Sequence, residues 1–206
     1  MTYLDVDTLS GMAPLRVAVF SLGSNLGDRF EYLQGAVGAL RATPCLKITG
    51  VSSVYETTPV GLVEQPDFLN IVVVTESTLP SMVMLERALA IEDAYSRVRV
   101  VPGGPRTVDV DLIAVGDRVL NGENLTLPHP RAHERAFVLA PWLEVEPDAE
   151  LVGHGRVADL LAGLDATGVH RRDDLRAASP WWSAPASAGR CSRPWTSSGR
   201  SCRASR

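Results

Sequence analysis

Two aspartates separated by a single residue give the sequence its clearest chemical pattern. Asp109 and Asp111 end the stretch Gly104-Pro-Arg-Thr-Val-Asp-Val-Asp111. In a β-strand, residues two apart point to the same face and lie about 7 Å apart. Two carboxylates on one face of an otherwise apolar strand must be solvated, paired with cationic side chains or neutralised by a metal ion.

Two interpretations of this aspartate pair stay open from the residues alone. Mg²⁺ takes one or two protein carboxylates and leaves its other positions to water and substrate phosphates. Arg97, Arg99 and Arg106 lie just upstream, and guanidinium groups bind phosphates bidentately, so the cluster fits a metal–polyphosphate site. In the alternative, the aspartates form ion pairs with these arginines on a solvated face of a sheet.

The turn Gly23–Asp28 and His129 carry weaker signals of phosphate chemistry. The turn follows an apolar segment and precedes an amphipathic one, where backbone N–H groups can cradle a phosphate. It lacks the glycine spacing of dinucleotide-binding and P-loop motifs, which favours a simple capped turn. His129 lies between two prolines. It is either an acid, base or phosphate donor held by a stiff segment, or an ordinary surface residue.

Asn70 and Glu92 are polar residues in apolar surroundings. Asn70 begins an apolar segment close to Phe68, so its amide either shapes a turn or reads the edge of a flat heterocycle that stacks on the ring. Glu92 shares a helical stripe with Leu85 and Ala88 and therefore faces inward. Its carboxylate needs a partner there, which is either an arginine or a hydroxyl or amine of a ligand.

These residues require a scaffold of strands and helices to position them. The strongest patterns run strand, helix, strand, strand, helix, strand, over residues 16–22, 29–41, 47–55, 68–76, 81–95 and 107–115. That order predicts an α+β fold, a ferredoxin-like split βαβ sandwich whose antiparallel sheet has both helices packed on one face. Weaker patterns predict a strand at 118–120, a short helix from Arg131, an apolar segment at 137–145 and a helix over 157–164.

The composition is that of a globular protein with an appended tail. Of 206 residues, 45% are hydrophobic, and 20 basic against 24 acidic side chains give a net charge of −4. We expect a flexible N-terminal segment over residues 1–15, a single domain over 16–176 and a disordered basic tail over 177–206. The tail contains arginines and tryptophans but no carboxylate. It is interpreted as a non-selected extension, with a partner-binding anchor and a nucleic-acid-binding tail as alternatives.

The same composition argues against several classes of protein. No apolar run approaches the roughly 18 residues of a membrane helix, and the acidic N-terminal segment predicts no signal peptide. Three cysteines without metal-ligand spacing predict no disulfide framework and favour a reducing, cytoplasmic setting. The net negative charge argues against nucleic acid as a general partner.

Taken together, these segments resemble one family, the 6-hydroxymethyl-7,8-dihydropterin pyrophosphokinases of folate biosynthesis. The resemblance covers about residues 16–151, and its most specific part is the stretch 104–111. The other matching stretches occur in the order of the family: Ser21–Asp28, Val51–Thr57, Gln65–Asn70, Ile91-Glu92, Arg97–Arg99, Leu127–His129 and Arg135–Leu139.

This resemblance implies a reaction as well as a fold. ATP would be the co-substrate, and its diphosphate would pass to the hydroxymethyl group of the pterin, giving AMP and the pterin diphosphate. Two Mg²⁺ ions would bridge ATP to the protein, and the substrate hydroxyl would be activated by metal or by Asp109 without a covalent intermediate. We expect a monomer whose partners are ATP and 6-hydroxymethyl-7,8-dihydropterin.

The resemblance also implies a role for each candidate residue. Asp109 and Asp111 would hold the metal ions. The phosphates would contact Arg97 and Arg106, with Arg99 joining as their loop closes. The nucleotide site would be lined further by Glu92, Leu112, Thr126, His129 and Arg135. The pterin would be read by Thr57, Val60, Asn70 and Asp109, stacked on Phe137 and flanked by Phe68.

Two rival functions remain open at this point. A catalytically impaired relative would bind ATP without turnover. A ferredoxin-like binding module would use the same fold for recognition alone, because a fold does not determine a function. The binding module predicts basic, aromatic outer strands and leaves Asp109 and Asp111 unexplained.

Overall fold

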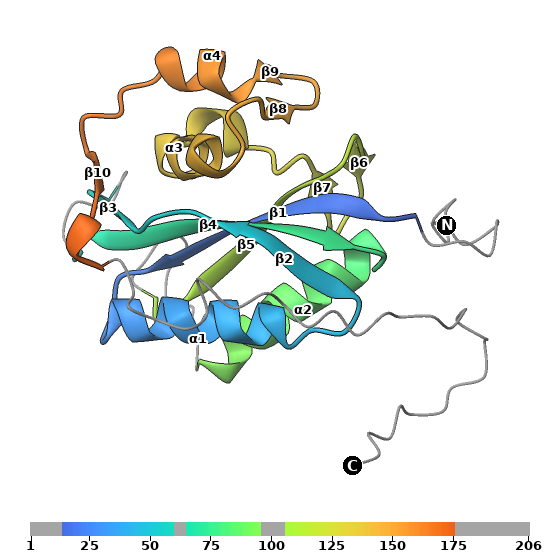
Figure 1. Cartoon of the computed structure of the whole chain (residues 1–206), viewed down its shortest axis with the longest axis horizontal. Coiled ribbons are helices and arrows are strands. Elements are labelled where there is room, and N and C mark those ends of the chain that lie inside the picture. The colour runs from blue at the N-terminus through green and yellow to red at the C-terminus, as the bar shows by residue number, and fades with distance from the viewer. Residues whose placement is uncertain (1–13, 60–64, 96–105, 176–206) are drawn as a thin grey trace.

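The computed structural model describes residues 14–59, 65–95 and 106–175, and its centre is a six-stranded antiparallel sheet (Figure 1). The strands of the sheet are β1 (Arg16–Ser24), β2 (Leu46–Val51), β3 (Tyr55–Thr57), β4 (Phe68–Ser77), β5 (Asp109–Val115) and β10 (Val169–Arg171). They follow the order β10-β3-β4-β1-β5, and β2 also pairs with β4. β2 and β3 pair with opposite ends of β4, so this long strand is the spine of the sheet.

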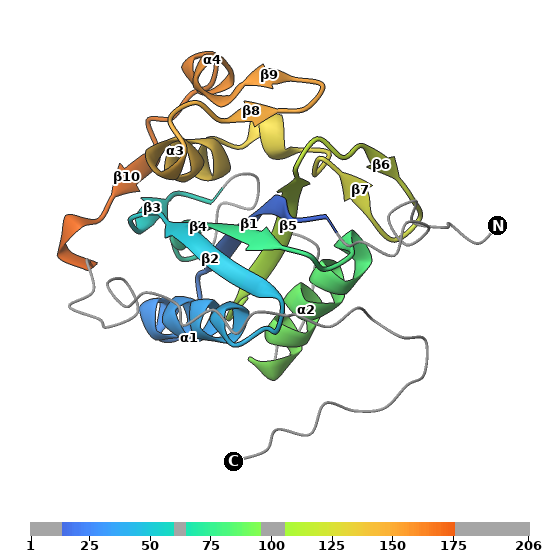
Figure 2. The ribbon, with the colours of Figure 1, turned by 45° about the vertical axis from the view of Figure 1, so that its right-hand side comes forward.

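Helices cover both faces of this sheet (Figures 1 and 2). On one face lie α1 (Arg29–Arg41) and α2 (Ser81–Ala94), and on the other lies α3 (Ala136–Val145) with α4 (Val157–Ala162) packed against it. α1 begins where the Asp28 side chain accepts a hydrogen bond of 3.0 Å from the Glu31 N–H, which satisfies one of the free donors at a helix start. Its buried residues are Leu33, Ala36, Val37 and Leu40.

Alternation along the strands divides the apolar side chains into two cores. Phe20 of β1 packs in the core on the side of α1 and α2. Val19 of β1 and Val72 of β4 pack in the second core, together with Trp142 of α3. The second core fills only part of its face of the sheet.

The remaining part of that face carries the polar residues singled out by the sequence. Gly23 of β1 lies opposite Asn70 of β4 on one side and opposite Asp109 of β5 on the other. Asn70 is two residues from Val72, so both point to the α3 face. Because directly opposed residues of an antiparallel pair share a face, Asp109 points there as well, and Asp111 follows two residues along β5.

The predicted order of strands and helices is confirmed, but two boundaries were wrong. The segment predicted as one strand over 47–55 forms two strands, β2 and β3. They separate because Ser53 turns toward α3, where its hydroxyl and its N–H donate to Glu144 at 2.7 and 3.1 Å. β5 begins at Asp109 rather than at residue 107, and before it the Thr107 hydroxyl donates to the Tyr95 carbonyl at 2.8 Å.

The elements predicted from the weaker patterns are shorter in the structure than expected. The predicted strand at 118–120 becomes β6 (Leu120–Asn121), which pairs with β7 (Thr126–Leu127). The predicted helix from Arg131 is a single 3₁₀ turn over Ala132–Glu134, and α4 ends at Ala162 rather than at 164.

Helix α3 and four small strands, β7 to β10, were not predicted. Segment 137–145 belongs to α3, and β10 adds an edge to the sheet; β8 (Glu150–Leu151) and β9 (Gly155–Arg156) form a separate hairpin. The proposed segments 1–15 and 177–206 lie almost wholly outside the described residues, so those assignments and the domain limits remain predictions. None of the described helices is long and apolar enough to cross a membrane.

Candidate active site

The two aspartates lie at the start of β5, each beside one arginine. Asp109 is 9% exposed, and its Oδ2 lies 3.0 Å from Nη2 of Arg106. Asp111 is half-buried, and its Oδ2 lies 3.0 Å from Nη1 of Arg135. Val110 and its neighbours on the opposite face belong to the first core, as strand alternation predicts. Arg135 was assigned to the nucleotide from the sequence, and the structure adds its ion pair with Asp111.

The electrostatics of the pair reflect its crowding. Burial, and then the negative charge of Asp109, raise the pKa of Asp111, while His129 and Arg135 oppose that shift. Burial lowers the pKa of His129, which the nearby Asp111 opposes. These carboxylates therefore form a compact anionic centre whose repulsion is relieved by cationic side chains on both flanks.

His129 lies along β5 in a segment that the backbone holds in place. Its N–H donates to the carbonyl of Ile113 at 2.8 Å, and its Nδ1 accepts from the Arg131 N–H at 3.2 Å. The peptide bond before Pro128 is cis. Thr126, also assigned to the nucleotide, belongs to the short strand β7 just before this segment.

A second polar group lies across Gly23 from the aspartates. Asn70 and Thr57 are both 4% exposed, and the Asn70 amide donates to the Thr57 hydroxyl at 2.7 Å. A Cβ at Gly23 would lie 2.9 Å from Oδ1 of Asn70, so only glycine leaves the amide room. The strand register thus brings together Asn70 and Thr57, which were predicted from the sequence, beside the predicted metal carboxylates.

The two arginines that pair with the aspartates each lie over an aromatic ring. The Arg106 guanidinium carbon lies 5.2 Å from the centroid of the Phe68 ring, and that of Arg135 lies 5.6 Å from the Phe137 ring. Both distances allow cation–π contacts. In addition, Nε of Arg106 is buried without a hydrogen-bond partner among the described atoms. A buried donor of this kind favours an anionic ligand at this place.

Asn25 is a site residue that the sequence indicated only as part of the Gly23–Asp28 turn. It is 2% exposed, and its Oδ1 accepts from the Arg106 N–H at 2.8 Å. Its Nδ2 lies 3.2 Å from both Oε1 of Gln65 and the carbonyl oxygen of Pro66. One amide therefore joins the segment entering β5 to the segment entering β4. No local spacing signals this contact, because its partners lie 40 and 81 residues away.

We expect Asn25→Asp to affect ligand binding on the β4 side of the site more than on the β5 side. The variant keeps an oxygen that accepts from Arg106, but it loses the N–H donor to Gln65 and Pro66 and brings oxygens into opposition there. The KM for the ligand bound on the β4 side should rise about 10-fold, while the KM for the ligand on the β5 side changes less than about threefold.

Steady-state kinetics with each substrate varied in turn, using the reaction proposed below, measure this split. Asn25→Ala is the matched variant, since it loses both contacts and should raise both KM values. Equal KM values for Asn25→Asp and the wild type would contradict the bridging role.

Comparison with known proteins identifies the family. A sequence model of the 7,8-dihydro-6-hydroxymethylpterin-pyrophosphokinases matches residues 19–147. The chain belongs to this family. A 2-amino-4-hydroxy-6-hydroxymethyldihydropteridine pyrophosphokinase of Mycobacterium leprae is 47% identical over 163 residues, covering 72% of this chain and 83% of the relative. Another, of Methylorubrum extorquens, is 42% identical over 154 residues, covering 75% of this chain and 97% of the relative.

Solved structures agree with the fold. Wild-type Plasmodium falciparum HPPK-DHPS, crystallised with pterin and p-hydroxybenzoate, matches with a TM-score of 0.54 at 15% identity over 72% of this chain. This chain spans 42% of the length of that longer chain. The predicted antiparallel sandwich is therefore shared with the pyrophosphokinase fold.

Two residues assigned to the nucleotide from the family resemblance lie on the far side of β5. The Leu112 side chain is 4% exposed in the core facing α1 and α2, so only its backbone is placed to line the site. Glu92 is 3% exposed, and its Oε1 accepts from the Val110 N–H at 2.8 Å. This hydrogen bond ties the inward-facing carboxylate to the β5 backbone between the two aspartates.

Three other predicted pyrophosphokinase residues lie outside the described part of the chain. They are Val60, Arg97 and Arg99. Their roles remain predictions, as does the closing of the loop that contains both arginines.

Proposed function

We propose that this chain transfers the diphosphate group of ATP to the hydroxymethyl group of 6-hydroxymethyl-7,8-dihydropterin, forming AMP and the pterin diphosphate of folate biosynthesis. The observation that carries the proposal is the placement of the Asn70–Thr57 pair and Asp109 on either side of Gly23. Gly23 thus separates an amide suited to reading a heterocycle from a carboxylate pair suited to holding a metal ion that phosphates share. We propose further that the enzyme acts as a cytoplasmic monomer.

The residues divide into a pterin half and a nucleotide half. In the pterin half, the Asn70 amide and the Thr57 hydroxyl offer donors and acceptors to the polar edge of the ring, and Phe68 and Phe137 offer apolar faces. In the nucleotide half, Arg106 offers its buried Nε to a phosphate oxygen.

The nucleotide half continues toward α3 and the β7 strand. Arg135 keeps its guanidinium beside Asp111, where it can pair with phosphate as well. His129 is hydrogen-bonded to the β5 backbone and Thr126 belongs to β7, which contacts β5, and both would contact the rest of the nucleotide. We assign these contacts to ATP because the family resemblance and the positive groups around the carboxylates agree.

The carboxylate pair fits Mg²⁺ that is shared with a substrate. No cluster of three or more His, Cys, Asp or Glu side chains capable of holding a metal exists among the described residues. Two carboxylates on one face match the partial ligand set that Mg²⁺ uses when phosphates complete its shell. Asp109 and Asp111 would hold the ions, which would supply charge neutralisation for the transferred diphosphate.

The remaining catalysis is positioning. Phosphoryl transfer needs in-line alignment and charge stabilisation more than covalent help. Gly23 keeps the space between the two halves open, Asn25 fixes both loops that border it, and Arg106 neutralises charge. The pterin hydroxyl is then held in line with the diphosphate of ATP, and no covalent intermediate with the protein is needed.

An assay of product identity tests the proposal. The protein with ATP, Mg²⁺ and the pterin should form AMP at a rate that depends on the pterin, and EDTA should reduce that rate at least about 10²-fold, with recovery on adding Mg²⁺. ADP or free phosphate as the product would contradict diphosphoryl transfer. ATP binding without turnover would favour the catalytically impaired relative instead.

A further inference from the structure

Glu56 of β3 is held by two arginines from distant parts of the chain. Its Oε1 lies 2.9 Å from Nη1 of Arg29 at the start of α1, and its Oε2 accepts from Nη1 of Arg172 just after β10. The three side chains are 24 to 30% exposed, so they are partly shielded from water. Although burial raises it, the hydrogen bonds from Arg172 and Arg29 lower the pKa of Glu56 below its ordinary value, which keeps the carboxylate ionised.

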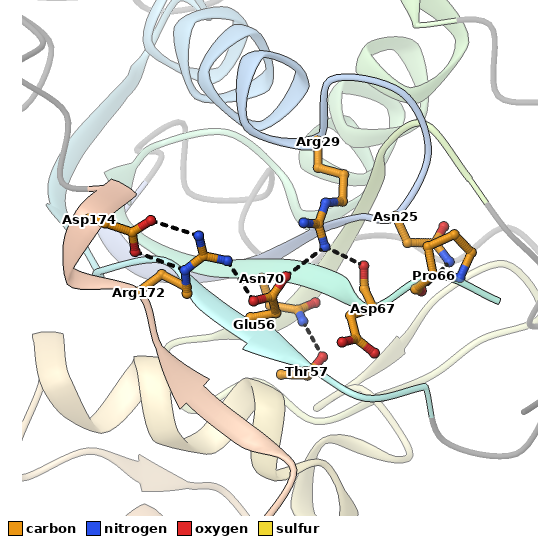
Figure 3. Close-up of polar contacts among 9 residues, drawn as sticks. All are labelled: Asn25, Arg29, Glu56, Thr57, Pro66, Asp67, Asn70, Arg172 and Asp174. Atoms are coloured by element: carbon orange, nitrogen blue, oxygen red, sulfur yellow. Dashed lines mark hydrogen bonds and ion pairs between the residues drawn. The ribbon is translucent and has the colours of Figure 1, made fainter.

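Each arginine carries a further contact that fixes its direction (Figure 3). Arg172 forms a two-pronged pair with Asp174, with Nε–Oδ1 and Nη2–Oδ2 distances of 2.8 and 2.7 Å. Arg29 donates through Nη1 to the carbonyl oxygen of Asp67 at 2.7 Å. The chain of contacts thus runs from Asp174 through Glu56 to the residue that precedes Phe68.

This chain of contacts lies on the face of the sheet opposite the Asn70–Thr57 pair, which we assign to the pterin. Glu56 and Thr57 are neighbours in β3, so their side chains point to opposite faces. The β3 backbone is paired with β4 at Phe68–Asn70 and with β10 at Val169–Arg171. Arg172 also donates its N–H to the Val54 carbonyl at 2.8 Å, which extends the ladder before β3.

A strand as short as β3 needs such support. It contributes only three residues to the sheet, so few backbone hydrogen bonds fix its position between β4 and β10. Thr57 must hold its hydroxyl oxygen 2.7 Å from the Asn70 amide if that amide is to stay oriented. Movement of β3 relative to β4 would displace one member of the pair from the other.

We propose that Arg172 is a positioning residue for the pterin half of the site, acting through Glu56 on β3 and, with Arg29, on the segment that enters β4. Arg172 and β10 lie beyond residues 19–147, the part matched by the family model. The C-terminal segment of this chain therefore completes the substrate site without touching substrate. This inference rests on the proposed function, because the pterin defines which half is affected.

The test compares Arg172→Gln with Arg172→Lys in steady-state kinetics. Arg172→Gln should raise the KM for the pterin about 5- to 10-fold and change the KM for ATP less than about twofold. Arg172→Lys should recover part of the loss, because it keeps the charge but not the fork that holds both carboxylates. Arg156→Gln is the matched control, since Arg156 is 56% exposed and its ion-pair partner Asp148 is fully exposed.

A double-mutant cycle with Glu56→Gln shows whether the contact itself is responsible. If Arg172 acts through Glu56, the double variant should have about the pterin KM of one single variant rather than the product of both effects. Thermal unfolding of every variant accompanies the kinetics. Loss of folded protein alone would lower kcat and leave both KM values unchanged.

The outcomes separate this inference from the proposed function. A wild-type protein that forms no AMP in the presence of the pterin would overturn the function itself. An active wild type with an unchanged pterin KM in Arg172→Gln would overturn only the positioning role. Equal increases in both KM values would overturn it too, because they would indicate a general loosening of the fold.

Discussion

Asp109→Asn should lower kcat for AMP formation at least about 10³-fold, because it removes a charge from the only pair of carboxylates on this face of β5 among the described residues. The amide is nearly isosteric, so Arg106 keeps a hydrogen-bond acceptor and the fold should be preserved. The measurement is AMP release at saturating ATP, pterin and Mg²⁺.

Asp117→Asn is the matched control for this variant. Asp117 is exposed in the turn that follows β5, and its replacement should leave kcat within about twofold of the wild type. Raised Mg²⁺ should recover activity more in Asp111→Asn than in Asp109→Asn if Asp109 also contacts the substrate hydroxyl. Full activity in Asp109→Asn would remove the basis for the metal assignment.

Arg106→Ala has the second-largest expected effect, a loss of about 10²- to 10³-fold in kcat/KM for ATP. This side chain pairs with Asp109 at 3.0 Å, lies over the Phe68 ring and keeps a buried Nε without a partner among the described atoms. Its removal takes a phosphate donor away and leaves Asp109 less neutralised before ATP binds.

Initial rates with ATP varied at saturating pterin measure this loss. Arg106→Lys should restore only a small part, since an ammonium group cannot supply both prongs of the guanidinium fork. Arg87→Ala, on an exposed position of α2, is the control and should behave like the wild type. A kcat/KM for ATP within about twofold of the wild type in Arg106→Ala would refute the phosphate contact.

Residue spacing alone predicted the features of the fold that depend on residues close together in the sequence. The bounds of α1 follow from the Asp28 cap and from an apolar stripe that Pro44 cannot continue. The shared face of Asp109 and Asp111 follows from the two-residue period of a strand. Both features depend on residues within a few positions of one another, which is why spacing alone identifies them.

Features that depend on distant partners were not accessible in this way. The separation of β2 from β3 arises at Ser53, whose partner Glu144 is 91 residues away. Helix α3 was missed because it is apolar on most sides and contains Pro141, so its sequence shows no amphipathic period. Glu56 and Arg172 are 116 residues apart, and nothing near either residue signals the other.

Gly23 sets the spacing between the two strands that carry the proposed substrate contacts. It lies one strand spacing from Asn70 and one from Asp109, so the backbones that carry the amide and the carboxylate are about 9.5 Å apart. On the proposed function, this length suits a two-ring heterocycle whose reacting arm lies at the end opposite its amide edge. On the same proposal, we expect a one-ring analogue anchored on Asn70 to leave its hydroxyl short of Asp109 and to be a poor substrate.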